Sequence, residues 1–308
     1  MIVVVCPGQG AQTPGFMLPW LDVPAFRNSI EAMQNASGID LIAHGTVSDA
    51  DTIRDTAVAQ PLIVSAGVAT LAALFDNGGQ VSAQIAGVAG HSVGEITAAV
   101  ASGIFTAEQG IRFVKERGDS MALAAGLEPT SMAAILGGDQ TIVELRLAEL
   151  GLEPANYNGG GQIVAAGSAA AIGELQAEGP AGSRVIPLQV AGAFHTRYMA
   201  PAVSTLAGYA SGLEVADPAT RLWTNAGGED ITSGQEFLNL MVNQVKSPVR
   251  WDLCMASMVE AGVTALIEVS PAGTLTGLAK RSMPGVETLA IKTPDNLEAA
   301  LELIANHA

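Results

Sequence analysis

The sequence predicts an α/β fold in which a large domain with a mostly parallel sheet is interrupted by a small inserted domain. Three observations support this. Strands alternate with longer helical patterns over roughly the first 120 residues, a shorter pattern of strands and helices fills the middle of the chain, and the alternation resumes from Ala191. We therefore assign 1–125 and 191–308 to the large domain and 126–190 to the insert.

The large domain is expected to begin with a buried strand. Ile2–Cys6 is a continuous apolar run, which is typical of a central parallel strand, and it ends abruptly at Pro7-Gly8-Gln9-Gly10. Gly103 follows an Ala-rich helical stretch, as a C-cap does. The other elements expected in this half are a strand over 85–89 and helices over 61–75, 95–102 and 107–125.

The insert has a recognisable order of elements. Strands are expected over 132–136, 154–157, 162–166 and 184–190, and helices over 140–150 and 169–178. This βαββαβ order is the ferredoxin-like arrangement. The large domain then continues, with a strand over 266–269 and a helix that runs to Arg281.

Charge and composition exclude several classes of function. Thirty acidic residues against 14 basic ones give a net charge of −16, which repels nucleic acid and anionic membranes. We see no apolar stretch long enough for a membrane span and no basic segment typical of a secretory signal. The only two cysteines, Cys6 and Cys254, fit neither a disulfide framework nor a metal site. We expect a cytoplasmic protein without a metal or redox cofactor.

The segment Gly90-His91-Ser92-Val93-Gly94 matches G-x-S-x-G between an expected strand and an expected helix. A serine on so sharp a turn is strained, and side chains two residues away on either side would collide with the turn. The helix N-terminus behind the serine offers free N–H groups where an oxyanion would form. Ser92 is therefore the candidate nucleophile, and the alternative is an ordinary glycine-rich turn.

The base for Ser92 should be one of four histidines. His307 adjoins the C-terminus, and His44 lies in a polar, loop-like region. His91 is next to Ser92, and neighbouring side chains at the end of a strand point apart. This leaves His195, where an apolar strand gives way to a turn, although a structural histidine is the commoner case.

Seven blocks of sequence together resemble the malonyl-CoA:acyl-carrier-protein transacylases, especially actinobacterial ones. They are Pro7–Gln12, Gly90–Glu95, Glu116-Arg117-Gly118 with Met121, Asn158–Gly167, Gly192–His195, Gln244–Trp251 and Pro271–Leu275. The resemblance implies an α/β-hydrolase-like large domain with a ferredoxin-like insert. It also implies a ping-pong reaction, in which Ser92 takes the malonyl group from malonyl-CoA and passes it to the phosphopantetheine thiol of acyl carrier protein, with His195 as base.

The resemblance also assigns roles to residues around the nucleophile. Gln9 and the backbone N–H of Val93 would form the oxyanion hole, although Gln9 alone would be read as a turn residue. The backbone carbonyl of Gln244 would accept the imidazole N–H of His195, so that Gln244→Ala is expected to be nearly silent.

Arg117 would hold the malonyl carboxylate and select malonyl over acetyl, because a buried anion needs a paired cation. A surface arginine is the alternative. Phe194 and Met121 would shape the acyl pocket or simply fill core, and His91 and Asn158 are further candidates for substrate binding.

Other functions remain open at this stage. They are a serine esterase or thioesterase, an acyltransferase domain of a larger synthase, and a non-catalytic carrier-binding module. The start at Met1 and the intact site residues favour a free-standing enzyme, for which we expect a monomer. Whether the carrier serves fatty-acid or polyketide synthesis, and which basic residues receive it, is left undecided between two groups: Lys280 and Arg281, or Arg197, Lys246 and Arg250.

Overall fold

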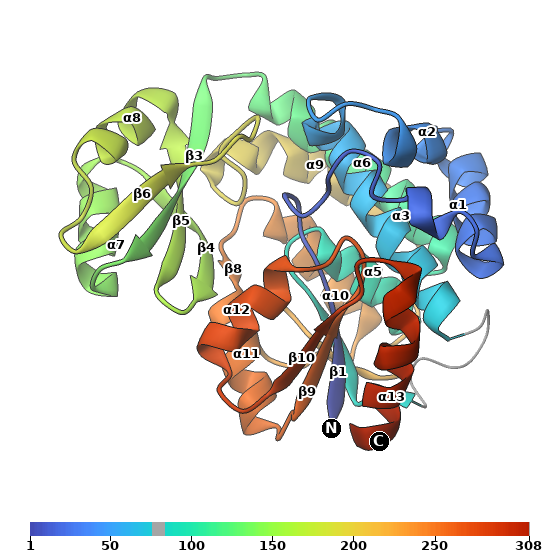
Figure 1. Ribbon diagram of the computed structural model, residues 1–308. Helices are drawn as coiled ribbons and strands as arrows, with labels where there is room; N and C mark the ends of the chain where they lie inside the picture. Colours follow the sequence, from blue (N-terminus) through green and yellow to red (C-terminus); the bar gives the residue numbers. More distant parts are fainter. Residues whose placement is uncertain (76–83, 308) are drawn as a thin grey trace.

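Two five-stranded sheets organise the chain in the computed structural model, which describes residues 1–75 and 84–307 (Figure 1). In the first sheet every neighbouring pair of strands is parallel. Its strands lie in the order β10 (Glu287–Ala290), β9 (Ala265–Glu268), β1 (Ile2–Cys6), β2 (Gly87–Gly90) and β7 (Arg221–Trp223). The predicted first strand is thus confirmed, and it lies at the centre of the sheet.

Helices cover both faces of this sheet, which explains why β1 is apolar along its whole length. Ile2, Val4 and Cys6 belong to one buried cluster, whereas Val3 and Val5 belong to another on the opposite face. Successive side chains of a strand point to opposite faces, so both faces of β1 require apolar residues. The first cluster lies against α1 (Pro24–Ser37), α3 (Thr56–Leu74), α5 (Gly94–Ala101), α6 (Ala107–Ala125), α9 (Ala200–Ala210), α10 (Gly234–Gln244) and α13 (Leu297–His307). The second lies against α11 (Trp251–Glu260) and α12 (Thr274–Ser282).

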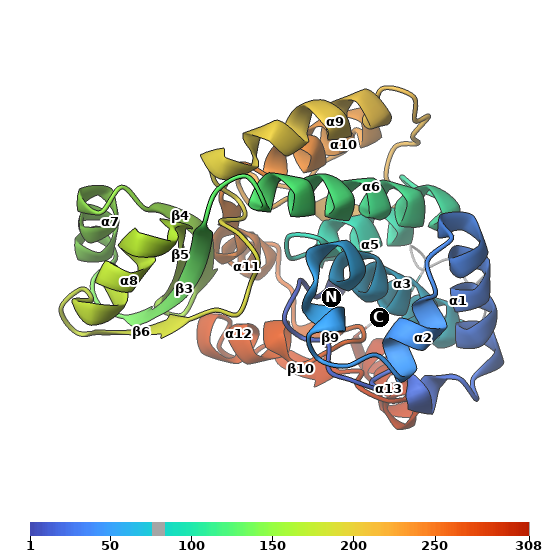
Figure 2. The same ribbon diagram turned by 90° about the horizontal axis from the view of Figure 1, so that it is seen from above.

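Viewed from above, α6 and α9 lie side by side along one border of the large domain (Figure 2). The predicted helix over 107–125 coincides with α6, and Gly103 adopts the left-handed conformation just beyond α5. The remaining short elements are α2 (Leu41–Thr46) and the 3₁₀ turns η1 (Leu18–Trp20), η2 (Thr52–Arg54), η3 (Arg197–Met199) and η4 (Pro294–Asn296).

The helix α3 differs from the sequence-based expectation. It begins at Thr56, not at Pro61, because the carboxylate of Asp55 accepts the Ala57 N–H and caps a turn that precedes the proline. The resulting 19 residues are long and apolar enough to cross a membrane by composition, with mean hydropathy 1.8, contrary to our expectation that no segment is. In the structure 78% of this stretch is buried inside the protein, so α3 is a core helix.

The second sheet has the predicted ferredoxin-like topology. Its order is β6 (Ser183–Pro187), β3 (Thr130–Gly137), β5 (Gln162–Ser168), β4 (Glu153–Gly159) and β8 (Val249–Arg250). The first four strands are antiparallel and all fall within 126–190, whereas β8 comes from the large domain and pairs parallel with β4. The strand β6 ends at Pro187, three residues earlier than predicted.

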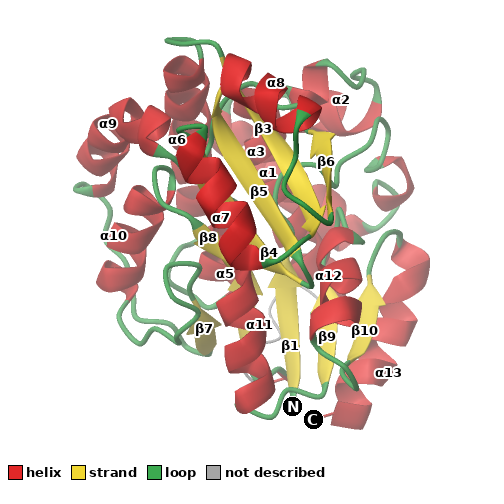
Figure 3. Cartoon of the chain, turned by 90° about the vertical axis from the view of Figure 1, so that its left-hand side faces the viewer, coloured by secondary structure: helices red, strands yellow, loops and turns green. Residues whose placement is uncertain are grey.

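The two faces of this second sheet have different partners. Ala133 and Ile135 of β3 pack against α7 (Gln140–Glu149) and α8 (Ala169–Ala177), which lie over the strands in Figure 3. Met132 and Ala134 point the other way, into the main core and toward the carboxyl end of β1 and β2. The small domain therefore covers the edge of the large sheet at which its strands end.

Candidate active site

The G-x-S-x-G segment forms a tight turn between β2 and α5. Ser92 has φ = 52° and is, with His195 (φ = 62°), one of the two non-glycine residues with positive φ in the described part of the chain. A Cβ on Gly90 would lie 2.0 Å from the carbonyl carbon of Gly94, and a Cβ on Gly94 would lie 2.1 Å from the Cys6 oxygen. Because both contacts are with backbone, only glycine fits at the two positions, as the motif predicts.

Asn225 holds this turn in place. It lies two residues after the end of β7, the neighbour of β2. Its Oδ1 accepts the Ser92 N–H at 2.7 Å, while its Nδ2 donates to the Gly90 oxygen at 2.8 Å. Its own N–H donates to Oε1 of Glu95 at 2.6 Å. The sequence analysis did not single out Asn225. The available signal was the pair of polar residues Thr224-Asn225 just after a short strand, where parallel strands gather functional side chains.

His195 faces Ser92 across a short hydrogen bond. Its Nε2 lies 2.7 Å from Ser92 Oγ, and its Nδ1 lies 2.8 Å from the backbone oxygen of Gln244. A carbonyl oxygen only accepts, so Nδ1 carries the proton and Nε2 is free to accept one. Burial first, and the nearby Arg117 second, lower the pKa of His195 to about 3. The imidazole is therefore neutral at physiological pH.

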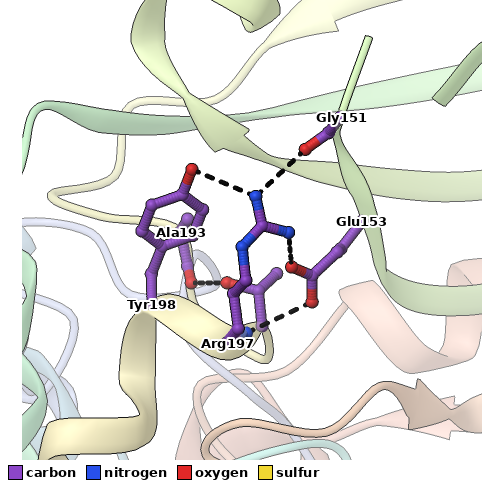
Figure 4. A network of polar contacts seen from close by, with 6 residues as sticks. Gly151, Glu153, Ala193, Arg197 and Tyr198 are labelled. Carbon is purple, nitrogen blue, oxygen red and sulfur yellow. Dashed lines mark hydrogen bonds and ion pairs between the residues drawn. The ribbon is translucent and has the colours of Figure 1, made fainter. Parts of the chain in front are cut away.

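The loop that carries His195 is attached to both domains. The His195 N–H donates to the Val245 oxygen at 2.9 Å. Two residues on, the Arg197 guanidinium forms an ion pair with Glu153 and donates to the Gly151 oxygen at 3.3 Å (Figure 4). Glu153 opens β4 of the small domain. These contacts fix the position of the base relative to the small domain, although the exposed ion pair itself adds little stability.

Arg117 projects from α6 into the same site and is only 2% exposed. Its Nη2 donates to Gln244 Oε1 at 2.8 Å and lies 3.4 Å from Ser92 Oγ, while Nη1 donates to Gln60 Oε1. Burial lowers the pKa of Arg117 to about 10, an effect that Glu95 opposes. The guanidinium thus remains charged beside the nucleophile, not on the surface.

The side chain of Gln244 has more contacts than the sequence suggested. Besides accepting from Arg117, it donates from Nε2 to Glu95 Oε2 at 2.6 Å and lies 3.3 Å from the Ser92 oxygen. Removing the side chain would leave a buried cation and a buried carboxylate without this partner. The expectation that Gln244→Ala is nearly silent considered only the backbone carbonyl and none of these side-chain contacts.

Two backbone N–H groups are free beside Ser92. Within residues 1–75 and 84–307, neither the Gln9 N–H nor the Val93 N–H has a hydrogen-bond acceptor, and both residues line the cavity described next. The Gln9 side chain itself donates to the Arg54 oxygen at 3.2 Å. An oxyanion hole is built from N–H groups of this kind, so the backbone of Gln9 is the part available for that role.

Ser92 opens into a cavity of about 300 Å³ between the two domains. One wall is the inner face of the small sheet, and another is α12 together with the loop after β1. Its lining contains the predicted site residues Gln9, His91, Ser92, Val93, Arg117, Met121, Asn158, Phe194 and His195, with Gln60, Leu278 and Arg281 among the others. The structure therefore brings together every predicted side chain except that of Gln244, which lies just beneath the cavity.

The remaining candidates differ in their surroundings. In the described part of the chain the His91 ring forms no hydrogen bond with Ser92, and its Nε2 lies 2.8 Å from Asn158 Oδ1. Burial lowers the pKa of His91. Met121 and Phe194 are both buried, and the Met121 sulfur accepts a hydrogen bond from Gln60 Nε2 at 3.4 Å. Gln60, which the sequence analysis missed, is one of four polar residues in the mostly apolar helix α3 and the only one of them with an amide side chain.

Comparison with known proteins agrees with this geometry. The family model described as acyl transferase domain matches residues 3–293. The malonyl CoA-acyl carrier protein transacylase of Mycobacterium tuberculosis is 45% identical over 303 residues, which cover 98% of this chain and all of that protein. A crystal structure of MCAT from Mycobacterium tuberculosis has a TM-score of 0.93 at 45% identity and covers 97% of this chain and 99% of that one. A structure of a type II PKS acyl-carrier protein in complex with its malonyl-transacylase has a TM-score of 0.91 at 29% identity and covers 98% of this chain and 99% of that one.

Proposed function

This chain belongs to the acyl transferase family and, within it, to the malonyl CoA-acyl carrier protein transacylases, and on this premise we propose how its residues transfer a malonyl group. The reaction carries malonyl from CoA to the phosphopantetheine thiol of acyl carrier protein for fatty-acid synthesis. The observation that supports our assignment best is the 2.7 Å contact between Ser92 Oγ and the neutral His195. A base with a free Nε2 is placed where a serine nucleophile needs one.

In the first half-reaction His195 Nε2 takes the proton of Ser92 as Oγ attacks the thioester carbonyl. The Gln9 and Val93 N–H groups receive the negative charge that develops on the carbonyl oxygen. The C–S bond then breaks, and the CoA sulfur leaves with the proton from His195. The product is a malonyl ester of Ser92.

In the second half-reaction the same groups act in reverse. His195 takes the proton of the phosphopantetheine thiol, the sulfur attacks the ester carbonyl, and Ser92 leaves with the proton. One thioester is exchanged for another, so the reaction needs no redox change and, in our proposal, no resident cofactor. We further propose that the enzyme acts as a cytoplasmic monomer.

Arg117 gives the site its preference for a charged acyl group. Its guanidinium is buried beside Ser92, and its hydrogen-bond partners Gln60 and Gln244 are neutral amides. A malonyl carboxylate entering the cavity can therefore form the charge pair that the guanidinium lacks. Phe194 and Met121 border the acyl group with apolar surface. His91 of the large domain and Asn158 of the small domain line the cavity as a hydrogen-bonded pair.

The test is to incubate the purified protein with radiolabelled malonyl-CoA in the absence of carrier protein. We expect about one label per enzyme molecule, transfer of the label to added holo-carrier, and no label on Ser92→Ala. Continuous release of CoA without retained label would instead mean that water is the acceptor, and the protein would be a thioesterase. Absence of both label and CoA release would refute catalysis altogether.

A further inference from the structure

Beneath the cavity an amide connects two buried charges. Arg117 Nη2 donates to Gln244 Oε1 at 2.8 Å, and Gln244 Nε2 donates to Glu95 Oε2 at 2.6 Å. We call Arg117, Gln244 and Glu95 the amide bridge. Glu95 is 1% exposed and Gln244 7%, and among the described residues Arg117 forms no direct ion pair with a carboxylate. The charge of Arg117 is therefore balanced from a distance, through a neutral group.

The direction of each hydrogen bond in the amide bridge is determined by its ends. A guanidinium only donates, so Gln244 must turn Oε1 toward Arg117 and Nε2 toward Glu95. On its other side Glu95 meets the backbone N–H of Asn225, which also only donates, at 2.6 Å. Glu95 must therefore accept from both sides, which an ionised carboxylate does.

Burial raises the pKa of Glu95 to about 8, against the donors around it and the charge of Arg117. The charges that act on this carboxylate are Arg117, which favours ionisation, and Glu229, which opposes it. The Thr224 side chain also forms a hydrogen bond with this carboxylate and lowers its pKa. A proton on Glu95 would replace an acceptor that the Gln244 and Asn225 donors use. The hydrogen-bond geometry thus favours the carboxylate form.

We propose that Glu95 is a positioning residue for malonyl recognition, which acts through the Gln244 amide to orient the Arg117 guanidinium toward the acyl pocket. This inference rests on the proposed role of Arg117. A carboxylate bonded directly to Arg117 would occupy the guanidinium N–H groups that the malonyl carboxylate needs. An intervening amide supplies the orientation and a balancing charge while it leaves N–H groups of the guanidinium free for substrate.

The first variant that tests this is E95Q, which keeps the shape and removes one acceptor. Whichever way the new amide turns, it places a donor against either Gln244 Nε2 or the Asn225 N–H. We expect kcat/KM for malonyl-CoA to fall roughly tenfold to 100-fold, mostly through KM, with acetyl-CoA much less affected. The variant Q244E should also be damaged, because it places two carboxylates face to face.

The decisive variant is the double exchange E95Q/Q244E. It restores the pattern, because the carboxylate at position 244 accepts from Arg117 and from the amide at position 95, whose oxygen accepts the Asn225 N–H. It also bonds a carboxylate directly to Arg117, so we expect the double variant to recover Tm that the single variants lose but not the malonyl preference. Recovery of Tm should be incomplete, because the 3.3 Å contacts of Gln244 Nε2 with the Ser92 oxygen and with Asn225 Oδ1 are lost.

A merely structural role for Glu95 predicts a different pattern. The matched control is E268Q, which removes another buried carboxylate that accepts two N–H groups, those of Leu275 and Thr276. It should lower Tm without changing the malonyl-to-acetyl ratio. An unchanged ratio in E95Q, an equal change in E268Q, or a double variant with the wild-type ratio would overturn the proposal.

The outcomes also separate this inference from the function on which it rests. A wild-type enzyme that retains no malonyl label refutes the proposed function and the role of Glu95 with it. A labelled wild type with an unaltered ratio in E95Q refutes the role of Glu95 alone. If E95Q does not fold, the malonyl-to-acetyl ratio of the double variant, in which the hydrogen-bond pattern is restored, decides the same question, and a wild-type ratio refutes the role of Glu95.

Discussion

Replacing Arg117 by methionine tests the origin of substrate selection. The change keeps an unbranched chain of similar length in the buried site and removes the charge 3.4 Å from Ser92 Oγ. Breaking a buried ion pair by removing one partner costs about 3–5 kcal/mol. At 1.36 kcal/mol per factor of ten, malonyl transfer should fall by roughly 150-fold to 5,000-fold relative to wild type. Acetyl transfer involves no such pair and should change far less.

The assay is kcat/KM for malonyl-CoA and for acetyl-CoA with the same holo-carrier. Arg117→Lys is the matched control, since it keeps the charge but cannot donate to Gln60 and Gln244 in the planar arrangement that the guanidinium has. It should retain an intermediate preference. If Arg117→Met lowered both substrates equally, the residue would support the site without recognising the carboxylate, and the reasoning would be wrong.

Two further predictions concern the nucleophile and its base. Asn225→Ala removes both side-chain hydrogen bonds to the turn that carries Ser92. In malonyl transfer kcat should fall roughly tenfold to 100-fold with a smaller change in KM, and Tm is measured alongside. An unchanged kcat would mean that the turn keeps its strained conformation without Asn225. Because the pKa of His195 is lowered from 6.5 to about 3, the folded protein binds fewer protons than the unfolded chain in that range, and stability should be lost as pH falls. Between pH 6.5 and 5 the wild type should lose about 1.6 kcal/mol more unfolding free energy than His195→Gln in urea titrations. Equal slopes for the two proteins would disprove the lowered pKa.

The sequence predicted the site best where the chemistry depends on contacts between residues that are close together in the chain. The G-x-S-x-G turn is defined by steric contacts within a few residues, as the distances around Gly90 and Gly94 show, so Ser92 could be found without a structure. His195 could be found because the chain has only four histidines and the other three were placed elsewhere. The ferredoxin-like insert was recognised because its strand and helix periods alternate clearly.

Residues that act through distant contacts were missed. Gln60, Glu95 and Asn225 lie on three different elements, and what they do depends on partners more than 50 residues away in the chain. No spacing rule relates such positions, and each by itself is an ordinary polar residue in an apolar surrounding. The start of α3 was misplaced for a related reason: Pro61 was read as a helix start, although the Asp55 cap allows the helix to begin before it.

The contacts of Arg117 connect substrate recognition with catalysis. Its charge is one of the causes that lower the pKa of His195, and it lies next to the serine that His195 must deprotonate. A malonyl carboxylate paired with Arg117 offsets that charge, so the bound substrate should make His195 a stronger base. An acetyl group leaves the charge uncompensated and His195 weakly basic. Selection of malonyl should therefore be expressed in the rate of acylation of Ser92 as well as in binding, and single-turnover labelling at saturating malonyl-CoA and acetyl-CoA measures this difference directly.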